Sequence, residues 1–369
     1  MTEHEMAESN EGMTYGASGV DTGAAGRALK GLADCVVETH SFRDAAGVGR
    51  PLRGLGYYAN VLDMGDGRGL AVAADGVGTK LIVAEMVGRY DTVGIDCIAM
   101  NVNDLICVGA EPIAMLDYVA VGTADQDVLA QVGQGLLEGA RQCEITIPGG
   151  ELAQVKEMLR GEGATEGFDL VGTAVGTVPL DRVMWGQDIV PGDVVVGIAS
   201  KGLHSNGYTL ARKALCPDGD YSRHDDDLGR TVGDELLEPT ALYVAFAKDL
   251  FRQDIPLHAI CHITGDGYMN LTRVEADVGF CLDDFPDPLP VFKAIQSRGN
   301  VDLAEMYTVF NMGIGLCVIL PADHADAVVA TSTRHGYAAR VLGQVTDRAG
   351  LVEIPQHGLA GRGGKLERV

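Results

Sequence analysis

Residues 69–80 read Gly-Leu-Ala-Val-Ala-Ala-Asp-Gly-Val-Gly-Thr-Lys, a short apolar run that ends in a glycine-rich turn. The run from Leu70 to Ala74 is typical of a strand buried on both faces, and open α/β sheets place ligands at their strand ends. In the turn, Asp75 can ligate Mg²⁺, backbone amides can approach phosphate, and Lys80 can neutralise phosphate charge. A tight turn with an exposed lysine is the plain structural alternative.

The clearest helix is predicted over residues 92–108, where apolar side chains recur at helical spacing. Asn101, Asn103 and Asp104 interrupt this pattern with side chains of low helix propensity, and Asn101 and Asp104 share one face. These three residues indicate either a solvated face of the helix or a metal or phosphate site, because Mg²⁺ takes oxygen ligands.

The remaining pattern alternates strands and helices, which predicts an α/β or α+β fold in two domains. We expect a disordered tail over 1–13, an N-terminal domain over 14–178, a C-terminal domain over 179–355 and a C-terminal tail over 356–369. Further strands are predicted at 113–121, near 144–147, and at 168–178, 193–199, 257–263, 278–283, 314–320 and 339–345. Further helices are predicted at 27–39, 125–142, 206–215, 233–253, 288–298 and 322–335.

The composition excludes several classes of protein. With 28 basic and 52 acidic residues, the 369-residue chain has a formal net charge of −24, which disfavours nucleic acid and anionic membranes as partners. The acidity indicates either general solubility or a salt-rich cytoplasm. We expect a cytoplasmic protein, because Met1 to Met13 lack the features of a signal peptide and no apolar run is long enough to span a membrane. The eight cysteines form no C-x-x-C pair, so buried reduced thiols are expected.

Three further glycine turns carry candidate functional residues. Gly149-Gly-Glu151 ends in a carboxylate that is either a metal ligand or a helix cap. In the stretch from Lys201 to Tyr208, Ser205 or Asn206 suits the N-cap of a helix whose N-terminus would bind an anion, and His204 can hold phosphate or move a proton.

The third turn follows a strand at His262-Ile-Thr-Gly-Asp-Gly267, with Thr264 inside it and Arg273 after it. Arg273 either binds phosphate through two N–H groups or is a surface arginine.

The order of these motifs resembles the phosphoribosylformylglycinamidine cyclo-ligase (AIR synthetase) family from about residue 14 to 345. The motif Asp104-x4-Gly109-Ala-x-Pro112 is shared with a wider superfamily that includes thiamine-monophosphate kinase and a hydrogenase maturation protein. The runs His204-Ser-Asn-Gly207 and Asn101-Val-Asn-Asp104 point to the cyclo-ligases within it.

The resemblance implies ATP-dependent closure of formylglycinamidine ribonucleotide to 5-aminoimidazole ribonucleotide in purine biosynthesis. It also implies a homodimer whose N-terminal domains form a joint β-barrel, with a C-terminal sheet packed with helices. Asp75 and Asp104 would hold Mg²⁺, and Lys80 and His204 would be catalytic. ATP would contact Gly76, Gly78, Thr79, Lys80, Asn101, Asn103 and Glu151. The ribonucleotide would contact His204, Ser205, Asn206, Thr264 and Arg273.

The chain departs from the family pattern at three places. Leu152 and Gln154 follow Glu151 where the family has a hydroxyl and a second carboxylate, Asp266 replaces a glycine, and Gly16 follows Tyr15 where a lysine is common. Two alternatives therefore stay open: another ATP-dependent enzyme of the superfamily, and a nucleotide-binding paralogue without turnover.

Overall fold

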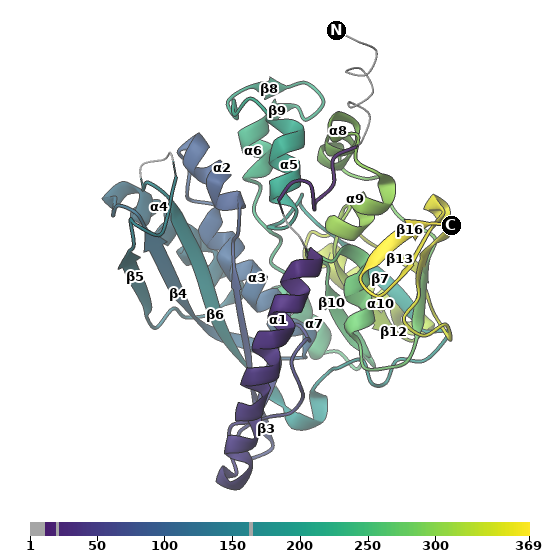
Figure 1. Cartoon of the computed structure of the whole chain (residues 1–369). Coiled ribbons are helices and arrows are strands. Elements are labelled where there is room, and N and C mark those ends of the chain that lie inside the picture. The colour runs from purple at the N-terminus through teal and green to yellow at the C-terminus, as the bar shows by residue number, and fades with distance from the viewer. Residues whose placement is uncertain (1–11, 20–21, 162–164) are drawn as a thin grey trace.

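Two β-sheets with their helices make up the protein in a computed structural model, which describes residues 12–19, 22–161 and 165–369 (Figure 1). The six-stranded first sheet has the order β1-β2-β3-β6-β4-β5, and the eight-stranded second sheet has the order β10-β12-β7-β13-β11-β14-β15-β16. A mixed α/β fold with two such units agrees with the fold class expected from the sequence. Of the expected tail over 1–13, only Gly12 and Met13 lie within the described residues.

The first sheet is antiparallel except where β5 runs parallel to β4. Helix α3 packs on one face of it, and α4 packs on α3. Gly94 makes this helix pairing possible, because a Cβ at Gly94 would lie 2.3 Å from the backbone nitrogen of Leu136. The elements of this unit are β1 (Arg50–Pro51), β2 (Asn60–Asp63), β3 (Arg68–Gly76), α2 (Lys80–Val87), α3 (Val93–Cys107), β4 (Glu111–Val121), α4 (Gln126–Cys143), β5 (Gly150–Gln154) and β6 (Phe168–Pro179).

In the second sheet, the neighbouring strands β7 and β12 carry mostly buried apolar residues. Its strands are β7 (Val194–Ala199), β10 (Ala259–His262), β11 (Gly279–Leu282), β12 (Ile314–Leu320), β13 (Ala339–Thr346), β14 (Val352–Ile354), β15 (Leu359–Arg362) and β16 (Lys365–Arg368). The helices of this unit are α5 (Tyr208–Leu215), α6 (Val232–Leu236), α7 (Val244–Phe251), α8 (Pro290–Gly299), α9 (Leu303–Val309) and α10 (Ala325–Arg334).

Helix α3 is buried on nearly all sides because it lies between the two units. It contacts β3 and β6 of the first sheet, and also β10 and α7 of the second unit. Of its polar residues, Asp96, Asn101 and Asn103 are fully buried. The prediction of a helix over 92–108 is confirmed, but the alternative of a solvated polar face is wrong.

Three sequence predictions about individual elements are wrong. The helix expected over 233–253 is two helices, α6 and α7, separated by a loop that contains Pro239, which cannot continue a helix. The strand expected near 144–147 is a single bridge between Ala114 and Thr146. The segment 356–369, expected as a tail, contains β15 and β16, whose Leu359 and Leu366 are buried.

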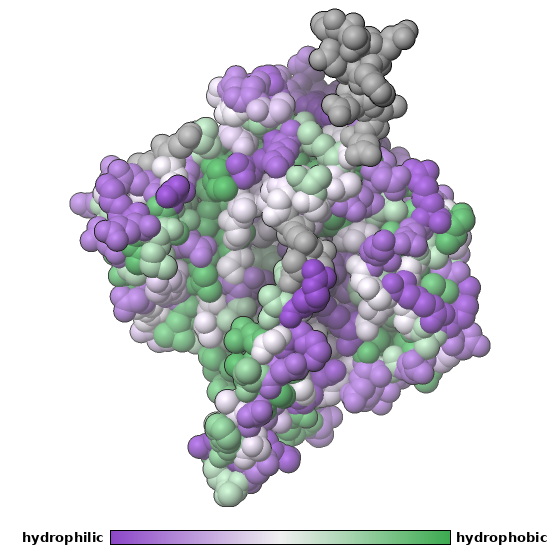
Figure 2. Space-filling view, viewed as in Figure 1, coloured by the Kyte–Doolittle hydropathy of each residue, from purple (hydrophilic) through white to green (hydrophobic). Residues whose placement is uncertain are grey.

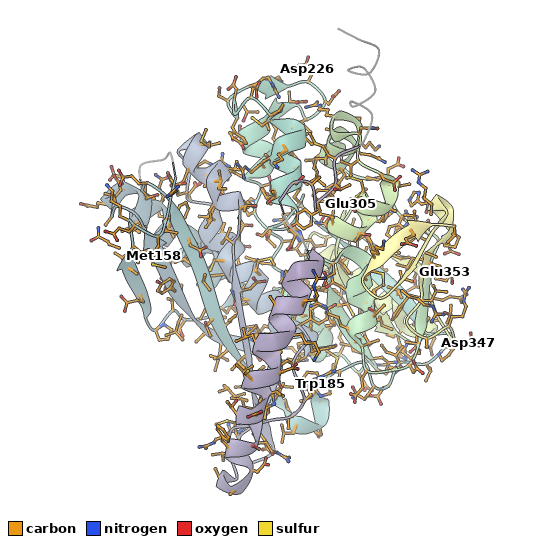
Figure 3. All side chains as sticks on the ribbon, viewed as in Figure 1. Met158, Trp185, Asp226, Glu305, Asp347 and Glu353 are labelled. Atoms are coloured by element: carbon orange, nitrogen blue, oxygen red, sulfur yellow. The ribbon has the colours of Figure 1, made fainter. Side chains whose placement is uncertain are left out.

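The N-terminal segment crosses onto the second unit before helix α1 (Thr22–Val36) begins. The backbone nitrogen of Tyr15 donates to Oε1 of Glu305 at 2.7 Å, and Lys213 donates to the carbonyl of Ser18. Figure 3 labels Glu305 beside this segment and Trp185 on the connection between the two sheets. No helix in the described part of the chain is both long and apolar enough to cross a membrane.

Candidate active site

Two carboxylates and one imidazole meet where α3 passes between the sheets. Asp75 ends β3, Asp104 lies on α3, and His262 ends β10. Nδ1 of His262 lies 2.9 Å from Oδ1 of Asp104, while its Nε2 is buried without a hydrogen-bond partner. Burial, and then the nearby charge of Asp104, raises the pKa of Asp75 to about 6. A cation bound beside Asp75 would relieve this unfavourable charge.

The two carboxylates suit Mg²⁺ better than a metal ion that is coordinated by protein side chains alone. Within the described ranges, no group of three or more His, Cys, Asp or Glu side chains is arranged to hold a metal ion. Mg²⁺ commonly takes one or two carboxylates and completes its shell with phosphate oxygens and water. Asp75 and Asp104 would supply the two carboxylate ligands, and a bound phosphate with water would supply the remaining ligands.

Lys80 lies in the interior rather than at an exposed phosphate site. Its side chain is 0% exposed, and Nζ lies 2.7 Å from Oδ2 of Asp96. The ammonium also donates to the backbone carbonyls of Glu238 at 2.7 Å and His204 at 3.3 Å. All of its hydrogen-bonding capacity is therefore used within the protein. This geometry corrects the expectation that Lys80 is a catalytic phosphate contact, and equally the alternative of an exposed lysine.

Asn101 and Asn103 are also structural in this geometry, although both were expected to contact the nucleotide. Asn101 accepts a hydrogen bond from the backbone nitrogen of Asp75 and donates back to its carbonyl, so it fixes the end of β3. Asn103 donates to the carbonyl of Ala241 and accepts from the nitrogen of Tyr243. Because these amides are satisfied by backbone groups, they hold the site in place rather than face a ligand.

The turn after β3 faces the start of α5 in the second unit. Oγ1 of Thr79 lies 3.2 Å from Oγ1 of Thr209, and Gly78 has a φ of 71°, which favours glycine. The backbone nitrogen of Gly76 donates to Oδ1 of Asp75. The structure therefore brings Gly76, Gly78 and Thr79 to the boundary between the units, as a loop that approaches phosphate would require.

His204 is buried, although a role in proton transfer was expected for it. Its side chain packs 6.2 Å from the ring of Tyr243, and a Cβ at Gly315 would lie 2.3 Å from its Cε1. Burial, with the charges of His262, Lys80 and Lys201 as smaller causes, holds the pKa of His204 well below its usual value. The imidazole is therefore neutral and has no route to a ligand in this conformation.

The residues after His204 lie closer to the expected arrangement. Oγ of Ser205 lies 3.1 Å from Oγ1 of Thr240, and Asn206 lies beside Gly265 of the third glycine turn. The N-cap of α5 is Gly207, with no side-chain cap, so the prediction of Ser205 or Asn206 as the N-cap is wrong. Asn206 is thereby left beside the turn that contains Thr264.

Arg273 has a partner that the sequence pattern did not reveal. Its Nη2 lies 2.6 Å from Oδ2 of Asp266, and its guanidinium lies 5.1 Å from the ring centroid of Tyr58. Oγ1 of Thr264 donates to Oδ1 of Asn270 at 3.4 Å. The carboxylate that replaces a family glycine thus neutralises the arginine expected to bind phosphate.

Glu151 lies in β5, at the edge of the first sheet, and is exposed. It caps no helix, so that alternative is wrong; its Oε1 accepts from the nitrogen of Leu152. Two nearby residues were missed as candidates. Asp117 shares a register row with Asp75 across Gly172, and its pKa is raised by burial. His262 was quoted only as part of a motif, because no sequence spacing links it to Asp104.

Comparisons with known proteins cover both units. A family described as AIR synthase related protein, N-terminal domain, matches residues 56–178, and its C-terminal counterpart matches residues 190–354. The chain is 42% identical over 344 residues to the phosphoribosylformylglycinamidine cyclo-ligase of Methanothermobacter thermautotrophicus, which covers 93% of this chain and 97% of that protein. It is 43% identical to the protein of that name from Thermococcus kodakarensis, over 94% of this chain and 99% of the relative.

Solved structures share the fold at much lower identity. Thiamine-monophosphate kinase from Stenotrophomonas maltophilia superposes with a TM-score of 0.59 at 21% identity, over 87% of this chain and 96% of that one. A hydrogenase maturation protein in complex with ATP superposes with a TM-score of 0.59 at 19% identity, over 81% and 85% of the two chains. These likenesses concern the fold alone.

Removal of the Lys80 charge tests whether this lysine is structural. We expect Lys80→Met to lower the free energy of unfolding by about 3–5 kcal/mol, because Asp96 would keep a buried, unpaired charge. The double variant Lys80→Met/Asp96→Leu should recover much of that stability. Denaturant unfolding of the three proteins measures both effects. A lysine that served only a phosphate ligand would leave the stability of the single variant unchanged.

Replacement of Asp75 by asparagine should stabilise the protein in the absence of divalent cations. The folded-state pKa of Asp75, about 6, lies above the ordinary value of 3.8. The folded protein therefore favours the protonated carboxyl. This contribution to the free energy of unfolding is fully present below about pH 4 and is lost as the pH rises through 6. Asp75→Asn should therefore raise the free energy of unfolding at pH 8 by up to about 3 kcal/mol, and at pH 5 by only about half as much. Denaturant unfolding at the two pH values checks this, and an equal effect at both would contradict it.

Proposed function

The chain belongs to the phosphoribosylformylglycinamidine cyclo-ligase family, and from that premise we propose that it uses ATP to close the imidazole ring of 5-aminoimidazole ribonucleotide in purine biosynthesis. The observation that carries this proposal is the similarity to cyclo-ligases along both units and nearly the whole length of the relatives. Other enzymes of the superfamily resemble the chain in fold alone, so another ATP-dependent activity is not favoured.

The reaction requires activation of a poor leaving group. Transfer of the γ-phosphoryl group to the amide oxygen of formylglycinamidine ribonucleotide gives an iminophosphate, and attack by the amidine nitrogen of the same molecule then releases phosphate. No protein nucleophile is required. Much of the acceleration comes from holding the two groups together, since oriented intramolecular reactions reach effective molarities of about 10⁵–10⁸ M.

In this proposal the first unit, expected over 14–178, supplies the triphosphate site. Asp75 and Asp104 would hold Mg²⁺, which neutralises phosphate charge when it is bound. The backbone amides between Gly76 and Thr79 would approach the phosphates. The buried polar residues Lys80, Asn101 and Asn103 would act indirectly, because they fix the loop, the end of β3 and the neighbouring unit.

The second unit, expected over 179–355, would hold the ribonucleotide. Ser205, Asn206, Thr264 and Arg273 come from two neighbouring loops and supply hydroxyl, amide and guanidinium donors. Arg273 already pairs with Asp266, so a substrate phosphate would have to share or displace that carboxylate. His262 is better placed than His204 to affect the site, because its Nδ1 lies next to Asp104.

We also propose that the protein is a homodimer in which the outer face of the first sheet meets its copy. In the strand register, Val72, Val171, Val175, Leu116 and Tyr118 point away from α3. Leu116 and Tyr118 are 45% and 42% exposed, and Figure 2 shows hydrophobic residues among hydrophilic ones on the side of the molecule that this sheet forms. An apolar sheet face of this kind is typical of a buried interface.

An assay of ADP release tests the activity directly. With ATP, Mg²⁺ and formylglycinamidine ribonucleotide, we expect turnover that depends on the ribonucleotide. Asp104→Asn should lower that turnover by about 100-fold or more, because a metal-held phosphate is worth several kcal/mol in the transition state.

The control is Asp226→Asn, which removes a carboxylate that is fully exposed and labelled at the top of Figure 3. It should retain full turnover, and circular dichroism should show that both variants are folded. Nucleotide binding without ribonucleotide-dependent ADP release would instead identify a paralogue without turnover.

The proposed dimer is tested by a charge on the outer sheet face. Tyr118→Lys should shift the protein from dimer towards monomer in sedimentation equilibrium, because the interface would bury an unpaired lysine charge from each copy. Leu137→Lys on α4, where the native side chain is 69% exposed, is the matched control and should leave the mass unchanged. A wild-type monomer would refute the proposed interface.

A further inference from the structure

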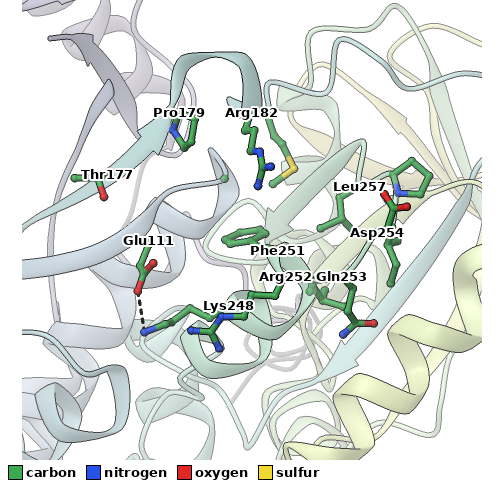
Figure 4. A pocket seen from close by; sticks show the side chains of 15 residues that line it. Glu111, Thr177, Pro179, Arg182, Lys248, Phe251, Arg252, Gln253, Asp254 and Leu257 are labelled. Atoms are coloured by element: carbon green, nitrogen blue, oxygen red, sulfur yellow. Dashed lines mark ion pairs between the residues drawn. The ribbon is translucent and has the colours of Figure 1, made fainter. Parts of the chain in front are cut away.

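A cavity of about 810 Å³ lies at the junction of the two units, and none of the candidate site residues described above lines it. Three stretches distant in sequence form it: the start of β4, the end of β6 with the connection that follows it, and residues 248–257, which run from the last turn of α7 towards β10 (Figure 4). Its volume lies in the range of small-molecule sites, about 300–1,000 Å³. Asp75, Asp104 and the glycine turns do not line it.

The charges on the cavity wall are not all used within the protein. Lys248 is already neutralised by Glu111 at 2.9 Å and Glu144 at 2.7 Å. The guanidinium of Arg182, in contrast, makes no hydrogen bond or ion pair with any residue that the structure describes. Among the residues of known placement, Arg252 pairs only with Asp249, at 3.6 Å. In a chain with a net charge of −24, two available guanidiniums on one cavity select for an anion.

The same wall offers a surface for a flat apolar group. Figure 4 shows Arg182 reaching from the connection after β6 towards the ring of Phe251 on α7. Met184 and Leu257 add apolar surface, and the one other carboxylate of the lining, Asp254, lies beside Leu257. An anion at Arg182 with a ring on Phe251 would therefore keep its charge away from Asp254.

From these observations we propose that the cavity binds a small planar organic anion, with its carboxylate or phosphate at Arg182 and its ring on Phe251. The site has a physical link to the candidate active site. The nitrogen of Met184 donates to the carbonyl of Val108 at 3.3 Å, and a Cβ at Gly109 would lie 2.8 Å from the carbonyl oxygen of Arg182. The connection that carries Arg182 is thus pressed against the end of α3, the helix that carries Asp104.

Calorimetry on the purified full-length chain tests the proposal independently of the ligase activity. Phenyl phosphate and benzoate are the probes, and their comparison distinguishes a phosphate from a carboxylate ligand. Inorganic phosphate lacks the ring and phenol lacks the charge, so both should bind more weakly than the better probe.

Arg182→Gln should weaken binding of the better probe about tenfold or more, since a guanidinium contact to an anion is lost. The charge-matched control Arg340→Gln, on β13, should leave the affinity unchanged. A saturating non-hydrolysable ATP analogue should not displace the probe.

Three results would overturn the proposal. They are no saturable binding of either probe, equal affinity in wild type and Arg182→Gln, and displacement of the probe by the ATP analogue. Thermal unfolding of Arg182→Gln should match wild type, because this side chain is exposed and has no partner in the described part of the chain.

Discussion

The buried ion pair between Lys80 and Asp96 is the interaction on which the relation of the two units depends. Both side chains belong to the first unit and are 0% exposed, yet their remaining hydrogen bonds go to the second unit. Oδ1 of Asp96 accepts from the nitrogen and the hydroxyl of Thr240, while Lys80 reaches the carbonyls of Glu238 and His204. A buried charge without its partner is strongly unfavourable. The ion pair therefore fixes the positions of the loops that contain His204, Glu238 and Thr240.

A second buried layer on α3 continues this constraint. Asn103 lies two turns after Asp96 and satisfies the backbone of the same connecting loop at Ala241 and Tyr243. Asn101, on another face, holds the backbone of Asp75. The helix thus fixes the end of β3 and the loop between α6 and α7 at once, which places Asp104 between them. Asn101 and Asn103, polar residues within an apolar helix, thus specify the backbone geometry around Asp104.

The candidate metal site is, in contrast, unfavourable to folding by itself. The raised pKa of Asp75 shows that its charge is opposed by burial and by Asp104. Such strain is expected at a functional site, where a bound cation relieves it. The rigid packing around α3 supplies the stability that holds the two carboxylates together. The polar contacts of α3 thus offset the unfavourable charge at the candidate metal site.

The sequence by itself determined the fold class, most strands and the helix over 92–108, because apolar periodicity reports burial directly. It also indicated Asp75, Asp104 and the glycine turns as candidate site residues, because strand ends and acidic or amide side chains have recognisable local patterns. It could not determine that Lys80 and Asn103 are buried, because their partners Glu238 and Tyr243 lie more than 100 positions away. Only the tertiary structure decided which polar residues face a ligand, since a hydrogen bond between distant segments leaves no spacing in the chain.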